Sequence, residues 1–521
     1  MRSRSLDYVR ASASGLLLAL SFPKFGHPAF AWIALAPLLT ALAHESRSPF
    51  VAPRGLAHAL RLGLLTGVVY FACTLYWITG VMATYGGIAT WAAVLVNAAL
   101  ILYLSLFPGL FAVIVRRVFL SIGRRALLAA PIVWVATELG RTYLFTGFPW
   151  VLLGYSQASV LPIAQLASVF GVWGVSMLVA SVSAVFALFA LDSRPAGPTR
   201  WLPVAVVLAL VLAVAVWGSR RAAASEWTRE GEAVRVGLIQ GNVDQGQKWS
   251  PDSAAAIFDS HIRMTRQAIA AGAEFVLWPE SSTPFRFEED QADADRLRAL
   301  ARQARVPILF GSDQIEWRNE GLRRVVDKMF NAAFLVRPDG TTGGTYRKMH
   351  LVPFGEYVPL QQVFFFAAPL TEQVGTFSPG LEAVVLPVRG HPVSVAICYE
   401  VVYPALVRQF VAGGSELLAT ITNDAWFGAT SAPYQHFEQA SMRAIEEGRY
   451  LVRAANTGIS GIVDPYGRVV TKSAIYEAAV LVGEARYLRT STFYARHGDV
   501  LPYASALVTL ALLVASRRRV Q

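Results

Sequence analysis

Apolar residues dominate two parts of the chain, and a mixed polar and apolar pattern fills the part between them. Long apolar stretches occupy residues 1–218 and return at 499–515. A helix needs about 20 mostly apolar residues to cross the hydrocarbon core of a bilayer. The pattern therefore predicts eight membrane-spanning helices, over residues 9–25, 28–44, 60–82, 87–115, 125–141, 160–191, 201–218 and 499–515.

Residues 233–498 show short runs rich in β-branched residues that alternate with amphipathic helical stretches. Strands are expected at 234–240, 274–280, 307–313, 331–337, 393–400, 416–424, 451–458 and 459–467, with helices near 252–271, 292–305 and 433–449. Buried strands that alternate with helices are typical of a layered α/β domain. The expected organisation is a seven-span membrane domain (1–218), a linker (219–232), the α/β domain (233–498), and a final membrane helix with a basic tail (499–521).

The composition supports a membrane class. Hydrophobic residues make up 54% of the 521 residues and charged residues 16%, which is more apolar than an ordinary soluble protein. The net charge of +11 does not predict a nucleic-acid partner, because a nucleic-acid binder concentrates its basic residues on one folded face. Here many of them lie in short loops between the expected spans.

The placement of arginines predicts the orientation in the membrane. Alternate loops and the C-terminal tail are rich in arginine, namely Arg47, Arg54, Arg61, Arg116, Arg117, Arg124, Arg125, Arg194, Arg200, Arg517, Arg518 and Arg519. Basic loops are cytoplasmic by the positive-inside rule. Both termini are then expected in the cytoplasm and the 233–498 domain on the extracytoplasmic side. Arg220 and Arg221 are mild exceptions.

Two ionisable residues lie near the outer end of an expected span. Glu138 and Arg141 precede a stretch rich in aromatic residues, glycine and proline. Ionisable groups at such a depth are usually paired or line a cavity. A structural ion pair and a role in lining a substrate site are both open interpretations.

The chain has two cysteines, Cys73 within an expected span and Cys398 in the α/β domain. A disulfide framework is therefore not expected. A lone thiol in an oxidising compartment is a liability unless it is deeply buried or reactive. Cys398 is for this reason a candidate functional residue.

Three strand ends of the α/β domain present polar residues. Glu280 follows the run FVLWP, Lys348 and Glu356 lie in RKMHLVPFGEYVP, and Cys398 ends the run SVAIC, followed by Tyr399 and Glu400. Sites in α/β sheets gather at the carboxyl ends of strands, so these residues are expected to converge.

Their chemistry fits nucleophilic catalysis. A thiol with a pKa near 8.5 is mostly protonated at neutral pH and needs a base or a positive field. Glu280 suits the base, and Lys348 together with the Tyr399 N–H suits an oxyanion. Each residue also has a structural interpretation, since cysteine is often a small buried hydrophobe and charged strand ends are often solvated.

The motifs WPES, RKMHLVPFGEYVP and ICYE, in this order, resemble the glutamate, lysine and cysteine motifs of the carbon–nitrogen hydrolase (nitrilase) superfamily. With IQGNVDQGQKW, NDAWFG and TELGRTYLFTGFPW, and with seven spans plus one, nearly the whole chain resembles the apolipoprotein N-acyltransferases. The resemblance implies a multispan α-helical membrane domain with an αββα nitrilase-like sandwich.

The resemblance also implies an activity. Such enzymes move an acyl chain from a phospholipid to the α-amino group of a lipoprotein's diacylglyceryl-cysteine in the bacterial cytoplasmic membrane, without a cofactor or metal. Glu280 is then the general base, Lys348 the oxyanion stabiliser and Cys398 the nucleophile that carries an acyl thioester. The implied partners are a membrane phospholipid and a diacylated apolipoprotein, without nucleic acid, and the chain is expected to be a monomer.

Further residues match family positions. Glu356 matches an accessory carboxylate, and Tyr399 and Glu400 match the residues that flank the nucleophile. Trp249, Trp426 and Phe427 match aromatic positions expected to bind substrate, although aromatics on a loop after a strand also commonly serve packing.

Two other functions are compatible with the sequence. A membrane-tethered amidase or nitrilase could use the same three residues on a small amide, but eight spans would then have little purpose. A transporter or receptor could retain the fold without catalysis, but few ionisable residues lie within the spans.

Overall fold

The computed structural model describes residues 2–43, 55–191, 198–248, 250–321, 323–357 and 377–518. Arg47, Arg54, Arg194, Arg519 and Trp249, which enter the sequence-based predictions, lie outside the described residues. The chain divides into two compact units. The helical unit comprises Met1–Thr79, Thr90–Ala224 and His497–Gln521, and the sandwich unit comprises Gly80–Ala89 and Ser225–Arg496.

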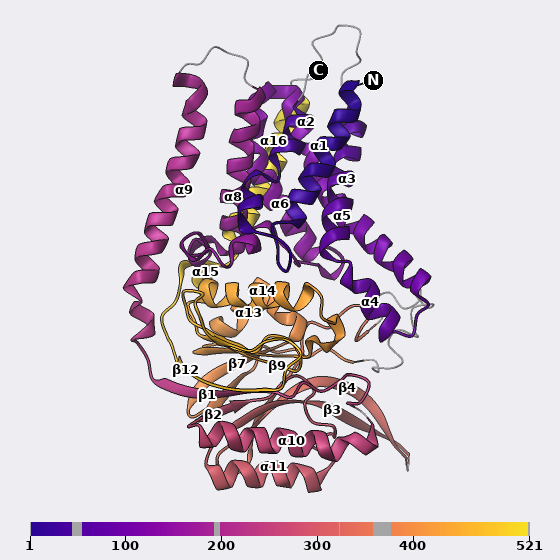
Figure 1. Ribbon diagram of the computed structural model, residues 1–521, viewed down its shortest axis with the longest axis vertical. Coiled ribbons are helices and arrows are strands. Elements are labelled where there is room, and N and C mark those ends of the chain that lie inside the picture. Colours follow the sequence, from indigo (N-terminus) through magenta and orange to yellow (C-terminus); the bar gives the residue numbers. More distant parts are fainter. Residues whose placement is uncertain are drawn as a thin grey trace. The chain divides into compact units, whose positions relative to one another are not determined.

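Long helices build the helical unit (Figure 1). Its helices are α1 (Arg2–Ala19), α2 (Ala36–Leu42), α3 (Leu56–Thr74), α5 (Thr90–Ile122), α6 (Ala130–Tyr143), α7 (Leu161–Ala164), α8 (Ala167–Leu191), α9 (Pro198–Ala224) and α16 (Val500–Arg518), with α4 (Trp77–Thr84) at the boundary between the units. The stretch 28–44 differs from the expected span, because its described part forms a short 3-10 helix (Pro28–Ile33) and the seven-residue α2.

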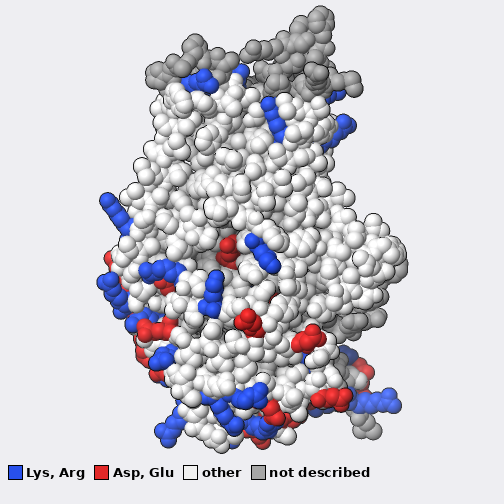
Figure 2. Space-filling model, in the orientation of Figure 1, with Lys and Arg blue, Asp and Glu red and all other residues white. Residues whose placement is uncertain are grey.

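Within the described residues, five helical stretches are long and apolar enough to cross a membrane. They are Leu56–Thr74, Thr90–Thr146, Ala167–Leu191, Arg200–Thr228 and Val500–Arg517. Their outer faces are apolar, as shown by Leu202 and Leu212 of α9 and Leu507 of α16, which are 61%, 64% and 69% exposed. The visible face of the helical unit carries few charged residues (Figure 2). Extended exposed apolar surface of this kind is typical of contact with lipid. The number of crossings and their orientation stay predictions.

Glu138 and Arg141 stabilise the irregular segment that follows α6. Glu138 Oε1 accepts a hydrogen bond from the Leu153 N–H at 2.7 Å, and Arg141 Nη1 donates to the Trp150 carbonyl at 2.7 Å. Both side chains are buried. Backbone groups that leave a helix within a membrane need such partners, so this geometry favours the structural interpretation of the two residues.

Two six-stranded sheets form the centre of the sandwich unit (Figure 1). The first has the order β12-β1-β2-β3-β4-β5, and the second has the order β11-β10-β9-β8-β7-β6. The strands of the first sheet are β1 (Ala233–Gln240), β2 (Phe275–Leu277), β3 (Ile308–Glu320), β4 (Arg323–Val336), β5 (Thr342–Arg347) and β12 (Ala479–Arg486). Those of the second are β6 (Val385–Val388), β7 (His391–Ile397), β8 (Leu417–Thr422), β9 (Leu451–Ala455), β10 (Gly461–Val463) and β11 (Val469–Lys472).

Parallel strands occupy the middle of each sheet, where β1, β2 and β3 pair in parallel and so do β7, β8 and β9. Helices α10 (Pro251–Ala270) and α11 (Gln291–Ala304) cover the first sheet, and α13 (Pro404–Ala412) and α14 (Ala432–Glu447) cover the second (Figure 1). The short α15 (Phe493–His497) follows β12. The layers run helix, sheet, sheet, helix, which confirms the expected combination of apolar helices with an αββα domain.

Local sequence explains where these helices begin and end. The Asp290 carboxylate accepts a hydrogen bond from the Asp293 N–H at 3.2 Å and so caps the start of α11. Proline stands in the first turn of α10 and of α14. Helix α14 ends at Gly448, whose φ of +65° is the left-handed conformation that glycine adopts without strain.

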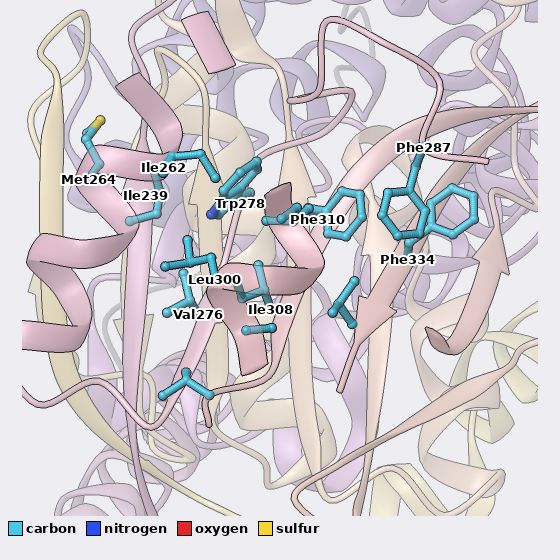
Figure 3. Packing of buried hydrophobic residues seen from close by; sticks show 14 of the residues in the cluster. Ile239, Ile262, Met264, Val276, Trp278, Phe287, Leu300, Ile308, Phe310 and Phe334 are labelled. Atoms are coloured by element: carbon cyan, nitrogen blue, oxygen red, sulfur yellow. The ribbon is translucent and has the colours of Figure 1, made fainter. Parts of the chain in front are cut away.

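A hydrophobic core lies between the first sheet and its two helices (Figure 3). It includes Phe258 of α10, Leu297 of α11, Phe310 of β3 and Phe334 of β4, all fully buried. Burial of each such side chain contributes roughly 1.5–3 kcal/mol. Trp278 joins this core and donates from Nε1 to Thr265 Oγ1 at 2.8 Å. The core thereby fixes the chain two residues before Glu280.

Candidate active site

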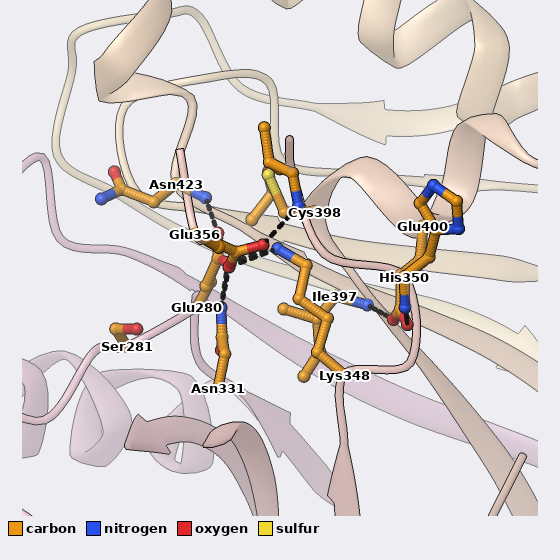
Figure 4. Close-up of polar contacts among 12 residues, drawn as sticks. Glu280, Ser281, Asn331, Lys348, His350, Glu356, Ile397, Cys398, Glu400 and Asn423 are labelled. Atoms are coloured by element: carbon orange, nitrogen blue, oxygen red, sulfur yellow. Dashed lines mark hydrogen bonds and ion pairs between the residues drawn. The ribbon is translucent and has the colours of Figure 1, made fainter. Parts of the chain in front are cut away.

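Three strand ends deliver the three candidate catalytic residues. Glu280 follows β2, Lys348 directly follows β5, and Cys398 directly follows β7. The strands belong to both sheets, so the side chains meet in the interior of the sandwich unit. In Figure 4 the side chains of Glu280, Lys348 and Cys398 point toward one another. All three are buried.

Lys348 lies between two carboxylates. Its Nζ atom is 2.9 Å from Glu356 Oε1 and 3.4 Å from Glu280 Oε1, and its side chain is 1% exposed. The Val352 N–H donates to the other oxygen of Glu356 at 2.8 Å. A buried ammonium with two carboxylate partners stays charged, and these partners raise the pKa of Lys348 above its ordinary value although burial itself lowers it.

Hydrogen-bond donors surround the Glu280 carboxylate. Besides Lys348, Oε1 accepts from Asn331 Nδ2 at 2.7 Å, and Oε2 accepts from the Asn423 N–H at 2.9 Å. Each of these partners donates a hydrogen bond to the carboxylate, and together they fix its position in the site. Gly311 of β3 permits this backbone position, because a Cβ there would lie 2.8 Å from the Cα of Glu280.

Asn331 is a site residue that the motifs did not reveal. Its Nδ2 donates to Glu280 at 2.7 Å and to Glu356 at 3.0 Å, so one amide joins the two carboxylates. Asn331 lies in the apolar run FNAAFLV of β4. A polar residue within such a run is the signal that could have identified it, since buried polar groups need partners.

Lys248 is a second buried lysine near the base. Its Nζ donates to the Glu280 carbonyl at 3.3 Å. Burial lowers the pKa of Lys248 to about 8, while the charges of Glu280 and Asp313 act in the opposite direction. The motif IQGNVDQGQKW contains this residue, but the family resemblance points to its neighbour Trp249.

Cys398 occupies a tight turn at the end of β7. Its φ of +53° lies in the left-handed region, which is unfavourable for residues other than glycine. Burial raises the pKa of the Cys398 thiol, the Glu280 charge raises it further, and Lys348 lowers it. The resting thiol is therefore protonated, and attack on a substrate requires a base to remove the proton.

Glu400 joins the nucleophile strand to the lysine segment. Its Oε2 accepts from the Ile397 N–H at 2.7 Å, and its Oε1 accepts from the Met349 N–H at 2.6 Å and from Tyr346 Oη at 2.7 Å. Burial raises the pKa of Glu400 to about 7, although these hydrogen bonds lower it. Glu400 thus joins the backbone that follows Lys348 to the strand that ends at Cys398.

The aromatic candidates pack against other rings. Tyr399 forms an edge-to-face contact with Tyr403, with ring centroids 5.2 Å apart. Trp426 contacts Tyr85 in the same way at 5.1 Å, and Phe427 contacts His436 at 5.9 Å. Both Trp426 and Phe427 stay half-buried, which leaves part of each ring available to a substrate. The role of Trp249 stays a prediction, because that residue lies outside the described part of the chain.

No group of three or more His, Cys, Asp or Glu side chains in the described ranges is arranged to hold a metal ion. The chemistry that the site offers is that of a buried thiol, a carboxylate base and an ammonium group. These groups suit formation of a covalent acyl intermediate.

The sandwich unit belongs to a known class of domain. Residues 235–487 match the family model described as carbon–nitrogen hydrolase. Among solved structures, a variant of the Nesterenkonia AN1 amidase from the nitrilase superfamily is 22% identical, with a TM-score of 0.38, over 54% of this chain and 98% of the amidase. The family match assigns residues 235–487 to the carbon–nitrogen hydrolase family, in agreement with the expected nitrilase-like fold.

Comparison of the whole chain gives a narrower assignment. Residues 14–185 match the model of the apolipoprotein N-acyltransferase N-terminal domain. The apolipoprotein N-acyltransferase of Geobacter metallireducens is 40% identical over 98% of this chain and 95% of the relative. That of Methylococcus capsulatus is 34% identical over 98% of this chain and 96% of the relative. The chain belongs to the apolipoprotein N-acyltransferase family.

Proposed function

We propose that this chain transfers a fatty acyl group from a membrane phospholipid to the N-terminal α-amino group of diacylglyceryl-cysteine apolipoproteins. Membership of the family supports lipoprotein N-acylation as the general activity. The observation that carries the mechanism is the buried group of Glu280, Lys348 and Cys398 in a carbon–nitrogen hydrolase domain.

The first half-reaction acylates the enzyme. The Glu280 carboxylate takes the proton of the Cys398 thiol as the sulfur attacks the ester carbonyl carbon of the phospholipid. A tetrahedral intermediate forms, and its collapse breaks the ester C–O bond. Glu280 returns the proton to the leaving alkoxide, which departs as lysophospholipid, and an acyl thioester remains on Cys398.

The second half-reaction transfers the acyl group. The neutral α-amine of the apolipoprotein attacks the thioester carbonyl, so that a C–N bond forms and the C–S bond breaks. Glu280 accepts a proton from the amine nitrogen and delivers it to the departing thiolate. The product is an amide, and Glu280 and Cys398 regain their starting states.

Lys348 stabilises charge in both half-reactions. Its ammonium is held by Glu356 at 2.9 Å and lies near both Glu280 and the thiol. A fixed positive group in a buried site stabilises a developing oxyanion more strongly than it would in water. The Tyr399 N–H, which belongs to the peptide after the nucleophile, is the second donor in this proposal.

The membrane explains how the enzyme meets its substrates. Both the donor and the acceptor carry lipid chains, and apolar helices of the enzyme share their bilayer. Confinement to one surface raises local concentration and restricts orientation. We place the sandwich unit on the extracytoplasmic face of the bacterial cytoplasmic membrane, with phospholipid and diacylated apolipoprotein as partners of a monomeric enzyme that binds no nucleic acid.

Transfer by the purified full-length chain tests this function. The chain is incubated with phospholipid vesicles and a synthetic diacylglyceryl-cysteine peptide with a free amino terminus, and peptide mass is followed. We expect the mass gain of one acyl amide with wild type and none with Cys398→Ala. A peptide with an acetylated amino terminus is the matched control. Release of free fatty acid without amide formation would favour the amidase-like hydrolase over the transferase.

A further inference from the structure

The carbonyl group of the candidate nucleophile has a buried partner on α14. His436 Nε2 lies 3.2 Å from the Cys398 carbonyl oxygen, and the His436 side chain is fully buried. A carbonyl oxygen can only accept a hydrogen bond. Nε2 must therefore carry a hydrogen. Two forms of the ring meet this condition, the neutral tautomer with its hydrogen on Nε2 and the imidazolium ion.

A charged pair orients His436 from its other side. Its Nδ1 is 3.0 Å from Asp424 Oδ1 and 3.0 Å from Arg453 Nη2. Arg453 Nη2 also lies 3.0 Å from Asp424 Oδ2. Neither Asp424 nor Arg453 is exposed, and buried charges keep a fixed geometry because loss of a partner is costly.

Two further contacts restrict the Asp424 carboxylate. Thr422 Oγ1 donates to Asp424 Oδ1 at 2.9 Å. A Cβ at Gly458 would lie 2.1 Å from Asp424 Oδ2, so the position requires glycine. The imidazole of His436 is thus held between a rigid ion pair and the backbone of the nucleophile.

The Cys398 carbonyl and the Tyr399 N–H belong to the same peptide group. A peptide group is planar and trans, so its C=O and N–H point in opposite directions and the orientation of one fixes that of the other. The φ of +53° at Cys398 is an unfavourable conformation that surrounding contacts must maintain. The contact from His436 is one that can do so.

We propose that His436, oriented by Asp424 and Arg453, is a positioning residue that holds the Cys398–Tyr399 peptide so that the Tyr399 N–H stays directed at the oxyanion. This inference rests on the proposed function, in which that N–H stabilises the tetrahedral intermediate. It adds a second group of buried residues, beyond Glu280, Lys348 and Glu356, on which the rate of acylation depends.

Two substitutions of His436 separate the role of Nε2 from that of Nδ1. The amide nitrogen of glutamine reaches the position of Nε2, whereas the amide of asparagine reaches only the position of Nδ1. His436→Gln retains a donor for the Cys398 carbonyl, and His436→Asn does not. Asp424→Asn is a further variant, which keeps the shape of the side chain but removes the charge that holds Arg453 beside the imidazole. His391→Gln, at the start of β7 and outside the site, is the matched control.

Two reactions of Cys398 give the readout. Acylation by phospholipid passes through an oxyanion, whereas alkylation by iodoacetamide is a displacement that forms none. We expect His436→Asn to lower the acylation rate on the order of tenfold to a hundredfold, through kcat and not KM. Its alkylation rate should stay within about twofold of wild type, because the thiol and its base are intact. His436→Gln should recover most of the acylation rate, and Asp424→Asn should show the same split in a weaker form.

Several results would overturn the inference. Acylation at the wild-type rate in a folded His436→Asn enzyme would do so, as would an equal loss of alkylation and acylation. An equal loss of acylation rate in His436→Gln and His436→Asn would show that a donor at the position of Nε2 does not matter. If His436→Asn does not fold, as judged by its melting temperature, the same criteria apply to Asp424→Asn. Failure of wild type itself to form an acyl-enzyme would contradict the proposed function, a result distinct from all of these.

Discussion

Lys348 shows most clearly how a single residue serves both stability and chemistry. Its ammonium forms ion pairs with Glu280 and Glu356, and both carboxylates accept hydrogen bonds from the Asn331 amide. Removal of one partner from a buried ion pair typically costs about 3–5 kcal/mol, because the remaining charge has no compensation. The same removal takes away the cation that would stabilise an oxyanion.

Lys348→Met should therefore lose both stability and activity. We expect a fall in unfolding free energy on the order of 3–5 kcal/mol and an acylation rate reduced about a hundredfold or more. Adding Glu356→Gln removes one uncompensated charge, so the double variant should regain stability but not activity. Thermal unfolding in detergent and the rate of acyl-enzyme formation measure the two effects. Recovery of activity in the double variant would contradict the assigned role of Lys348.

The raised pKa of Glu400 leads us to expect that this residue's contribution to stability depends on pH. Burial raises its pKa to about 7 from the ordinary 4.5, although hydrogen bonds from Ile397 and Tyr346 oppose the shift. The folded protein then holds this proton more tightly than the unfolded chain does. The stabilisation that comes from this bound proton is complete below pH 4.5, the ordinary pKa of a glutamate, and is lost as the pH rises through about 7.

Glutamine mimics the protonated carboxyl group, so Glu400→Gln should lack this dependence. We expect the melting temperature of wild type minus that of Glu400→Gln to be largest near pH 5 and smaller near pH 8. Comparing the two proteins at each pH cancels the contributions of other buried carboxyl groups. A difference that stays constant between pH 5 and pH 8 would show that Glu400 is ionised across this range and would contradict the raised pKa.

At the residue scale, the sequence identified side chains that carry distinctive motifs but not those that support them. Glu280, Lys348 and Cys398 each end a recognisable run, and the structure places them together. Asn331 and His436 lie within a strand and a helix whose patterns indicate only burial. Their contacts join residues 51 and 38 positions apart in the chain, and such pairings depend on tertiary packing.

At the scale of elements, periodicity located most strands and helices of the sandwich unit. The strand expected at 331–337 is the end of a longer hairpin, because β3 and β4 extend to Glu320 and from Arg323. The outer part of that hairpin is polar and exposed, so no alternation of burial marked it. The sequence predicts one apolar span over 28–44, yet two short helices form there, with Pro28 as the first residue of one and Pro37 as the second residue of the other. Proline starts helices readily but interrupts them, which hydropathy alone does not register.

Two aromatic candidates, Trp426 and Phe427, belong to the 3-10 helix Asp424–Phe427. Trp426 packs against Tyr85, and Tyr85 Oη donates to the Ala425 carbonyl at 3.2 Å. Aromatic pairs of this geometry contribute roughly 0.5–1.5 kcal/mol beyond burial. The pair fixes one edge of the Trp426 ring, and we propose that the part of the ring that stays accessible contacts an acyl chain.

Trp426→Leu should weaken binding of the phospholipid. We expect KM for phospholipid to rise about threefold to tenfold, with the acylation rate at saturation little changed. Tyr85→Phe is the matched control, because it keeps the ring contact and loses only the hydrogen bond. A fall in the saturated rate without a change in KM would indicate that Trp426 serves packing of the site and not binding of substrate.

At the scale of the whole molecule, the arginine-rich loops determine the expected orientation. Reporter fusions after Gly231 and after Gln521 can test it. A reporter that is active only in the cytoplasm should work at Gln521 and fail at Gly231, because the sandwich unit is expected outside. Cytoplasmic activity at Gly231 would contradict the orientation and, with it, access to exported lipoproteins.

The central claim is that Cys398 carries an acyl group between the two substrates. The most direct measurement is the intact mass of the full-length enzyme after exposure to phospholipid without any acceptor. We expect a gain of one acyl group on Cys398, removable by hydroxylamine, with one lysophospholipid released for each enzyme. Addition of the diacylglyceryl-cysteine peptide should then discharge the adduct as an amide. Absence of the adduct in an enzyme that still transfers acyl groups, or undiminished transfer by Cys398→Ala, would show that Cys398 does not carry the acyl group.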